Sequence, residues 1–239
     1  MGGSRFEVPE RQGFQRYHPT QNAGTPLLGR SYTAAAEIGS INTVKNDEHA
    51  LTGFNTDGVG ALNAMQAAGI RPEGRSVLLL GAGGAARVIA YALAGRGCQV
   101  EIANRTVSNA RRLAKSLYAK FGRKMKVVPL SKTALKNSVS QAEIILNASS
   151  MGMDGKHNPP IDERWIRGDH CVFDLVYRPV RTKLLRDALS AGAKTVTGLD
   201  MLVNQGACSF ALWTGKKAPI GEMRRAVAKK LSSEIVTNR

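Results

Sequence analysis

Short β-type runs alternate with longer segments of helical period over most of the chain. Buried strands that alternate with helices are typical of βαβ units, in which right-handed crossovers join parallel strands and place helices on both faces. The pattern therefore predicts an α/β fold built on a doubly wound parallel sheet. The expected strands cover 77–80, 100–103, 126–129, 143–147, 171–175 and 195–197. The expected helices cover 85–95, 108–121, 132–139, 182–191 and two closing segments, of which the last is 220–235.

The segment before this alternation has a different pattern. Residues 41–44 and 51–54 read as two short strands joined by a polar turn, and 34–38 could end a helix. Residues 57–68 predict a helix with Val59, Leu62 and Met65 on one side and Gly69 at its end. Residues 1–30, rich in Arg, Gln, Gly and Pro without an apolar period, are expected to be a poorly ordered arm.

Composition is that of a globular protein, with 43% hydrophobic and 22% charged residues in 239. No apolar run approaches the ~20 residues that span a bilayer, and the N-terminus lacks the apolar core of a signal peptide. The three cysteines are far apart in sequence, without the spacing of metal ligands: Cys98, Cys171 and Cys208. Reduced thiols and a cytoplasmic location are therefore expected, with no bound metal and no membrane partner.

The formal net charge of +16 requires an anionic partner or a well-solvated surface. A phosphorylated cofactor with a carboxylate substrate would suit it, and so would nucleic acid. Aromatic residues make up only 5% of the chain and are not interleaved with the basic ones, so a platform for stacking bases is poorly supported. A small-molecule partner is the favoured interpretation.

A glycine turn follows the strand expected at 77–80. In Gly81-Ala82-Gly83-Gly84-Ala85, the first glycine permits a tight turn and Gly83 lets the backbone approach a pyrophosphate. Small Ala86 lets the next helix pack close to the strand, and the N–H groups at the start of that helix attract phosphate. This strand, turn and helix predict a dinucleotide site, with a turn that binds nothing as the alternative.

The end of the next strand indicates which dinucleotide is bound. NAD-binding folds usually place an Asp or Glu there to hold the ribose 2′-hydroxyl. This chain has Asn104-Arg105-Thr106 instead. A carboxylate would repel a 2′-phosphate, whereas a guanidinium can pair with it through two hydrogen bonds. The sequence thus favours NADP(H) over NAD.

Several further segments fall at the carboxyl ends of expected strands, where ligands bind in such folds. They are Asn104, 147–152, 174–177 and Gly198. Packing alone does not require polar residues and glycines at each of these turns, which favours a functional site there, although any one of them could be an ordinary loop.

Four segments, together with the glycine turn and Asn104-Arg-Thr106, resemble the shikimate dehydrogenase family. The resemblance runs in order from about residue 34 to 235 and is specific as a set. The segments are Gly39-Ser-Ile-Asn-Thr-Val44, Gly53-Phe-Asn-Thr-Asp-Gly-Val-Gly60, Asn147-Ala-Ser-Ser-Met-Gly-Met153 and Gly198-Leu-Asp-Met-Leu-Val-Asn-Gln205.

The resemblance implies roles for individual residues. Asp57 would be catalytic, hydrogen-bonding the hydroxyl that becomes the ketone. Asn42, Asp57, Tyr177 and Gln205 would bind substrate, with Gln205 opening the helical region after Gly198. Leu175 and Gly198 would flank the nicotinamide. The remaining cofactor contacts are expected from Gly81, Ala82, Gly83, Gly84, Ala85, Asn104, Arg105 and Thr106, with Ser149 to Met151 near the ribose and pyrophosphate. From the residues alone, Asp57 could instead cap the helix that follows it.

Two departures from the family pattern stand out. The family usually carries a basic residue where this chain has Asn109, with Arg111 and Arg112 just beyond, so a displaced arginine could assist Arg105. Asn55 is preceded by 54 residues, fewer than the family's substrate domain needs, and the catalytic lysine segment of that domain has no clear counterpart. We therefore expect a complete NADP domain beside an incomplete substrate domain.

The expected domains are a Rossmann-type NADP domain at 56–204 and a substrate-domain remnant at 31–55 plus 205–239. The resemblance implies NADPH-dependent reduction of 3-dehydroshikimate to shikimate, a step of aromatic amino-acid biosynthesis, in the cytoplasm. Two alternatives stay open. One is a quinate/shikimate enzyme that uses NAD, and the other is a non-catalytic NADP(H)-binding remnant.

Overall fold

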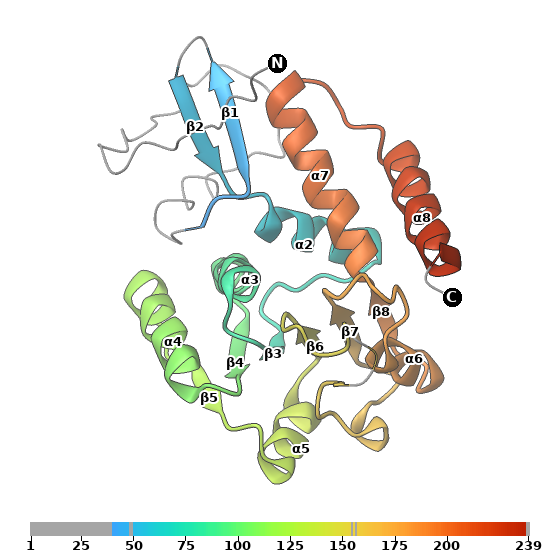
Figure 1. Cartoon of the computed structure of the whole chain (residues 1–239). Helices are drawn as coiled ribbons and strands as arrows, with labels where there is room; N and C mark the ends of the chain where they lie inside the picture. The colour runs from blue at the N-terminus through green and yellow to red at the C-terminus, as the bar shows by residue number, and fades with distance from the viewer. Residues whose placement is uncertain (1–39, 48–49, 154, 156, 238–239) are drawn as a thin grey trace.

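The computed structural model describes residues 40–47, 50–153, 155 and 157–237. Its centre is a six-stranded sheet in the order β5-β4-β3-β6-β7-β8, with every neighbouring pair parallel (Figure 1). This is the strand order of a dinucleotide-binding doubly wound sheet, whose direction of winding reverses between β3 and β6. The strands are β3 (Ser76–Leu80), β4 (Gln99–Ala103), β5 (Lys126–Val128), β6 (Ile144–Asn147), β7 (Cys171–Asp174) and β8 (Lys194–Val196).

Helices cover both faces of this sheet because alternate strand residues point to opposite sides. Leu79, Ile102 and Leu146 pack with α2, α3 and α4 in one cluster, and Leu78 and Ile145 pack with α5 and α6 in another. The helices of the described chain are α2 (Asp57–Ala67), α3 (Gly84–Gly95), α4 (Val107–Phe121), α5 (Lys132–Gln141), the short 3-10 turn η1 (Glu163–Trp165), α6 (Lys183–Ser190), α7 (Gly198–Thr214) and α8 (Ile220–Thr237).

A separate antiparallel hairpin, β1 (Thr43–Asp47) and β2 (Ala50–Phe54), stands beside α7 and away from the main sheet (Figure 1). The indole Nε1 of Trp213 on α7 donates a hydrogen bond to the carbonyl oxygen of Val44, 2.9 Å away. The hydroxyls of Thr43 and Ser209 lie 2.7 Å apart and are buried. These contacts fix the hairpin to α7, so that the loop between the hairpin and α2 has a defined position.

The α/β fold and the position of every strand and helix expected from residue 41 onward are confirmed, with ends that differ by at most three residues. Gly69 follows the end of α2 with φ of 68°, as a helix-terminating glycine does. The expected arm at 1–30 and the helix end at 34–38 lie outside the described residues. No helix of the described chain is long and apolar enough to cross a membrane.

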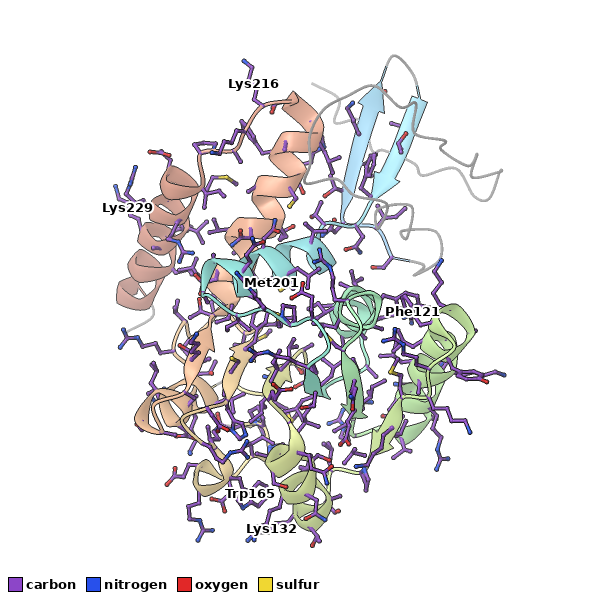
Figure 2. All side chains as sticks on the ribbon, turned by 180° about the vertical axis from the view of Figure 1, so that it is seen from behind. Phe121, Lys132, Trp165, Met201, Lys216 and Lys229 are labelled. Atoms are coloured by element: carbon purple, nitrogen blue, oxygen red, sulfur yellow. The ribbon has the colours of Figure 1, made fainter. Side chains whose placement is uncertain are left out.

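The packed side of α2 includes small residues as well as Met65 and Leu62. Met65 is buried, but Val59 and Leu62 are only half-buried, whereas Gly58, Ala61 and other small residues face the interior. The reason is that α2 packs against both α3 and α7, and small residues let those helices approach closely. Two of the basic side chains, Lys216 and Lys229, are exposed and directed away from the body of the molecule (Figure 2).

Candidate active site

The glycine turn joins β3 to α3 at the point where the sheet reverses its winding. Gly81 has φ of 116°, and its N–H donates to the carbonyl oxygen of Ala103 at the end of β4, 2.8 Å away. A Cβ at this position would stand 2.7 Å from the carbonyl oxygen of Ala148 after β6. Backbone conformation and close approach therefore both require glycine here.

Beyond Gly81 the turn has open space for a ligand. A Cβ added at Gly83 or Gly84 would meet no described atom within 4 Å. Gly83 occupies the cap position of α3 and provides no side-chain hydrogen bond to the first N–H groups of the helix. Ala86, one step further on, is fully buried against the sheet. The turn thus has the shape and the free backbone donors that a pyrophosphate needs, so the residues present fit a dinucleotide.

The loop from β4 to α4 carries Arg105, the residue expected to favour NADP(H) over NAD. The Nδ2 of Asn104 donates to the carbonyl oxygen of Thr106, 2.9 Å away, which closes the loop on itself. Arg105, between them, is exposed. Gly81 donates to Ala103 at the end of the strand that leads into this loop, so Arg105 closely follows a contact of the glycine turn. This placement suits the ribose of a dinucleotide.

A buried polar network joins the ends of β6 and β7. The Asp174 carboxylate is fully buried and accepts hydrogen bonds from Asn147 Nδ2 at 2.9 Å, the Val176 N–H at 3.0 Å and Thr182 Oγ1 at 2.6 Å. Burial raises the pKa of Asp174, while these three donors lower it. All three partners donate, so the arrangement is matched to the ionised carboxylate.

The same network holds the two loops that border the glycine turn. Asn147 Nδ2 also donates to the carbonyl oxygen of Met151 at 2.9 Å, and Ser149 Oγ donates to Asn147 Oδ1 at 2.6 Å. On the β7 side, a Cβ at Gly198 would overlap the carbonyl oxygen of Leu175. The first residue of α7 therefore touches the loop after β7, and Leu175 and Gly198 are neighbours.

An acid and an amide face each other at the start of α2. Asn42 Nδ2 donates to Asp57 Oδ1 over 2.8 Å, from the residue that precedes β1. Asp57 is the first residue of α2, whereas Thr56 occupies the cap position, so Asp57 is not the helix cap. Burial raises the pKa of Asp57, and the hydrogen bond from Asn42 partly offsets the shift.

The orientation of Asn42 follows from its other contacts. Its Oδ1 accepts hydrogen bonds from the Thr56 N–H at 2.9 Å and from Thr43 Oγ1 at 3.0 Å. A backbone N–H is always a donor, so Oδ1 must face Thr56 and Nδ2 must face Asp57. The side chain of Asn55 closes a turn just before α2, since its Oδ1 accepts a hydrogen bond from the Asp57 N–H at 3.0 Å. The acid is thus positioned from two sides.

Gln205 approaches this cluster from α7. The buried Thr56 hydroxyl lies 3.2 Å from Gln205 Oε1, and also 3.2 Å from Asn42 Oδ1 and from Ser209 Oγ. The hydroxyl carries one proton, so it can donate to only one of these oxygens at a time. Thr56 is therefore the link between the acid cluster and α7.

The structure brings Asn42, Asp57 and Gln205 together, as expected of one site. Gln205 lies in the middle of α7, however, not at its opening, because the helix begins at Gly198 with Thr197 as its cap. Tyr177 lies in the loop after β7 with 40% of its surface exposed, and no hydrogen bond in the described part of the chain joins it to Asp57.

The sequence does not indicate that Thr43 and Ser209 belong to the site, or that Asp174 accepts three hydrogen bonds. Gln205 and Ser209 are four residues apart on one helix, a spacing that places both on the same face, and this signal could have been noticed. The contact between Thr43 and Ser209 spans 166 residues of sequence and has no local signature.

The winding of the sheet, the glycine turn at its switch point and the held acid at the start of α2 define a dinucleotide-binding α/β protein with a polar site beside the nucleotide domain. Comparison with known proteins makes the assignment specific. Residues 64–154 match the family model for shikimate / quinate 5-dehydrogenase, and residues 198–228 match that for the C-terminal domain of shikimate 5′-dehydrogenase. The chain belongs to the shikimate dehydrogenase family.

One relative is the shikimate dehydrogenase (NADP(+)) of Moorella thermoacetica, which is 39% identical over 217 residues, 90% of this chain and 74% of that protein. The Thermus thermophilus shikimate 5-dehydrogenase, solved with NADP(H) and shikimate, superposes with a TM-score of 0.72 at 36% identity, covering 86% of this chain and 71% of that one. The Corynebacterium glutamicum quinate dehydrogenase, solved with NAD, superposes with a TM-score of 0.75 at 31% identity, covering 82% and 70%.

Proposed function

We propose that this protein is an NADP-dependent oxidoreductase that interconverts 3-dehydroshikimate and shikimate. The observation that carries the proposal is the Asp57 carboxylate, held by Asn42 at 2.8 Å and linked through Thr56 to Gln205, next to a domain with an open glycine turn. Membership of the family supports the substrate, and the name of the Moorella relative supports the cofactor.

The acid handles the proton of the reacting hydroxyl. When shikimate is oxidised, the carbinol carbon loses a hydride and its hydroxyl loses a proton to Asp57, which leaves the ketone. The raised pKa makes Asp57 a stronger base than an ordinary aspartate, and in the reducing direction it returns the proton. The nicotinamide of the cofactor supplies or accepts the hydride. Asn42 keeps one oxygen of Asp57 fixed in either direction.

Substrate binding is assigned to side chains around this acid. Gln205, whose side-chain amide offers one oxygen acceptor and one NH₂ donor, would bind ring hydroxyls next to the Thr56 hydroxyl. Asn42 borders the same space. Tyr177 is proposed to form part of the wall of the substrate site. Its exposure leaves the residue accessible to a ligand.

Cofactor binding is assigned to the three loops at the switch point. Pyrophosphate would lie on the backbone of Gly81, Ala82, Gly83, Gly84 and Ala85, with the loop around Ser149 alongside. Asn104, Arg105 and Thr106 would hold the adenosine ribose and its phosphate. Leu175 and Gly198 would border the nicotinamide. This distribution is supported by the contacts of Gly81 with both neighbouring strand ends.

The proposed division into domains follows from this assignment. We assign residues 56–204 to the NADP domain, and 31–55 with 205–239 to the substrate part of the chain. Helix α7 runs without a break through the boundary at 204 and 205, so it would connect the two parts rigidly.

Free thiols support a reducing, cytoplasmic environment. The three cysteines are unpaired, and Cys98 and Cys171 are buried. Burial raises the pKa of Cys98 to about 11, and its Sγ donates to the carbonyl oxygen of Pro72 at 2.9 Å. A thiol in this state is an inert part of the core.

The test is the absorbance of the reduced nicotinamide during incubation of the purified chain with shikimate and NADP⁺. Quinate and NAD⁺ serve as controls. Turnover with shikimate and NADP⁺ that exceeds every other combination is expected. Preference for quinate with NAD⁺ would contradict the proposal, and cofactor binding without turnover would identify a non-catalytic NADP(H)-binding protein.

A further inference from the structure

Three side chains that can form hydrogen bonds follow one another along one side of α7: Gln205, Ser209 and Trp213. Successive members are four residues apart, a spacing that places side chains on the same face of a helix. At one end of this row, Gln205 Oε1 and Ser209 Oγ each lie 3.2 Å from the Thr56 hydroxyl. Trp213 lies roughly two turns beyond Gln205, about 11 Å along the helix axis. The row therefore extends from the cluster around Asp57 to the hairpin beside α7 (Figure 1).

The hairpin of β1 and β2 depends on α7 for a fixed position, because a two-stranded hairpin alone is marginally stable in water. Two successive residues of β1 are held by this row of α7. The Thr43 hydroxyl lies 2.7 Å from that of Ser209, and the Val44 carbonyl oxygen accepts from Trp213 Nε1 at 2.9 Å. The first contact is buried, whereas Trp213 and Val44 are more than half exposed. With an inner and an outer attachment, β1 cannot pivot about either one.

Asn42 immediately precedes the two residues that α7 holds. Its Nδ2 donates to Asp57 Oδ1 at 2.8 Å, and its Oδ1 accepts from the Thr56 N–H at 2.9 Å. Both bonds require a fixed distance between β1 and the first turn of α2, so a displacement of β1 along α7 would stretch them. The pKa of Asp57 is raised by burial and lowered by the bond from Asn42. A displaced Asn42 would therefore leave the effect of burial less opposed.

We propose that Trp213 is a positioning residue for proton transfer at Asp57, because its bond to Val44 holds β1 where Asn42 meets the acid. It acts through β1 and Asn42 and not by contact with the reacting atoms. This inference rests on the proposed function, since it assumes that Asp57 handles the proton of the substrate hydroxyl. The indole N–H suits this role because it only donates, so a carbonyl oxygen is its natural partner.

Trp213→Phe tests the bond, because phenylalanine keeps an aromatic ring but has no N–H to donate. Steady-state kcat/KM for oxidation of shikimate by NADP⁺ is measured across the pH range. We expect a fall of roughly fivefold at neutral pH, the effect of one ordinary hydrogen bond. The acid limb of the profile should also move to higher pH, because a looser Asn42 lowers the pKa of Asp57 less. The dissociation constant for NADP⁺ should stay the same.

The matched control is Trp165→Phe, the same change in the other tryptophan of the chain. Trp165 packs against the cluster under α5 and α6, at the end of the molecule away from the hairpin (Figure 2). Its replacement should leave kcat/KM and the pH profile as they are in the wild type. Thermal unfolding of both variants shows how much each change costs in stability.

A second comparison asks whether Trp213 acts through Asn42. Asn42→Ala removes the amide that Trp213 is proposed to position. In that background, Trp213→Phe should change kcat/KM by less than about twofold, because two residues that act through one contact have non-additive effects. A fivefold loss in both backgrounds would show that Trp213 acts by another route and would overturn the assignment.

The outcomes separate this inference from the function on which it rests. If the wild-type chain oxidises shikimate and the two tryptophan variants share its kcat/KM and pH profile, the assignment of Trp213 is wrong and the proposed function stands. A lower unfolding midpoint of Trp213→Phe with an unchanged pH profile also overturns it, since the bond then only stabilises the hairpin. If the wild-type chain oxidises neither shikimate nor quinate, both proposals fall.

Discussion

Gly60 of α2 lies against the backbone of Gln205 on α7. A Cβ at residue 60 would stand 2.6 Å from the Cβ of Gln205 and 2.7 Å from its backbone nitrogen. The absence of a side chain at Gly60 therefore lets α7 come close enough for Gln205 to reach Thr56. The lack of a side chain at Gly60 thus determines the position of Gln205, a residue proposed to bind substrate.

Gly60→Ala tests this relationship. Alanine favours a helix interior over glycine by about 1 kcal/mol, but here overlap with the backbone of α7 should outweigh that gain, since overpacking costs roughly 1–3 kcal/mol. We expect a lower midpoint in thermal unfolding and a higher KM for shikimate. Gly206→Ala is the control, because its Cβ would meet only the flexible end of Met223, 3.3 Å away. Equal midpoints for the two variants would contradict the close contact.

Asp57→Asn should separate activity from stability. Removing the proton acceptor should lower kcat by about 10²–10⁴-fold, the usual contribution of general acid–base catalysis. The pKa of Asp57 is raised in the folded protein, so at neutral pH the buried charge destabilises the fold, and this cost disappears as pH falls through the folded pKa. The amide variant should therefore unfold at the same temperature or higher at pH 7, with the difference lost in acid.

The pH profile of the wild-type enzyme gives an independent reading of the same group. Oxidation of shikimate needs the ionised carboxylate, so kcat/KM in that direction should fall as the solution is acidified through a pKa above that of an ordinary aspartate. Normal activity of Asp57→Asn would show that Asp57 does not transfer the proton of the reacting hydroxyl.

Asp174→Asn should destabilise the protein through one mismatched hydrogen bond. An asparagine that keeps its Oδ1 toward Asn147 and Val176 turns its NH₂ group toward the Thr182 hydroxyl, whose own proton then loses its acceptor. A buried polar group left without a partner costs about 1–3 kcal/mol. Chemical denaturation should show this loss, and NADP⁺ should bind more weakly because the loop at 148–151 depends on Asn147.

The control for this variant is Asp169→Asn, in which an exposed carboxylate that pairs with Arg167 is changed in the same way. Pairs of this kind contribute little, so its denaturation midpoint should stay near that of the wild type. If both variants unfold alike, the buried network does not stabilise the ends of β6 and β7 as we describe.

The parts of the fold that the sequence predicts are those with a local cause. The central strands β3, β6 and β7 are mainly apolar runs between turn residues, and Gly81 has the positive φ that this strand-to-helix turn needs. The placement of Gln205 has no such cause. It depends on the contact with Gly60, 145 residues earlier, and only the folded chain shows it.

Helical phase explains a second difference. The resemblance implies a basic residue where this chain has Asn109. Arg111 and Arg112 both follow shortly after it, and the sequence alone does not show which of the two lies beside Asn109. In the structure Arg112 lies beside Asn109 in the lining of a small cavity between α3 and α4. Residues three apart share a face of a helix, whereas Arg111 lies one position off that face.

Gln205→Ala should affect substrate binding and leave cofactor binding unchanged. Gln205 Oε1 lies 3.2 Å from the Thr56 hydroxyl, in the cluster around Asp57. Loss of hydrogen bonds to ring hydroxyls should raise the KM for shikimate roughly tenfold, with a smaller change in kcat, since such bonds are made in the ground state and the transition state alike. The dissociation constant for NADP⁺ should stay the same. Gln66→Ala, at an exposed position of α2, should change none of these values. A lower kcat at unchanged KM would instead place Gln205 among the residues that position Asp57 through Thr56.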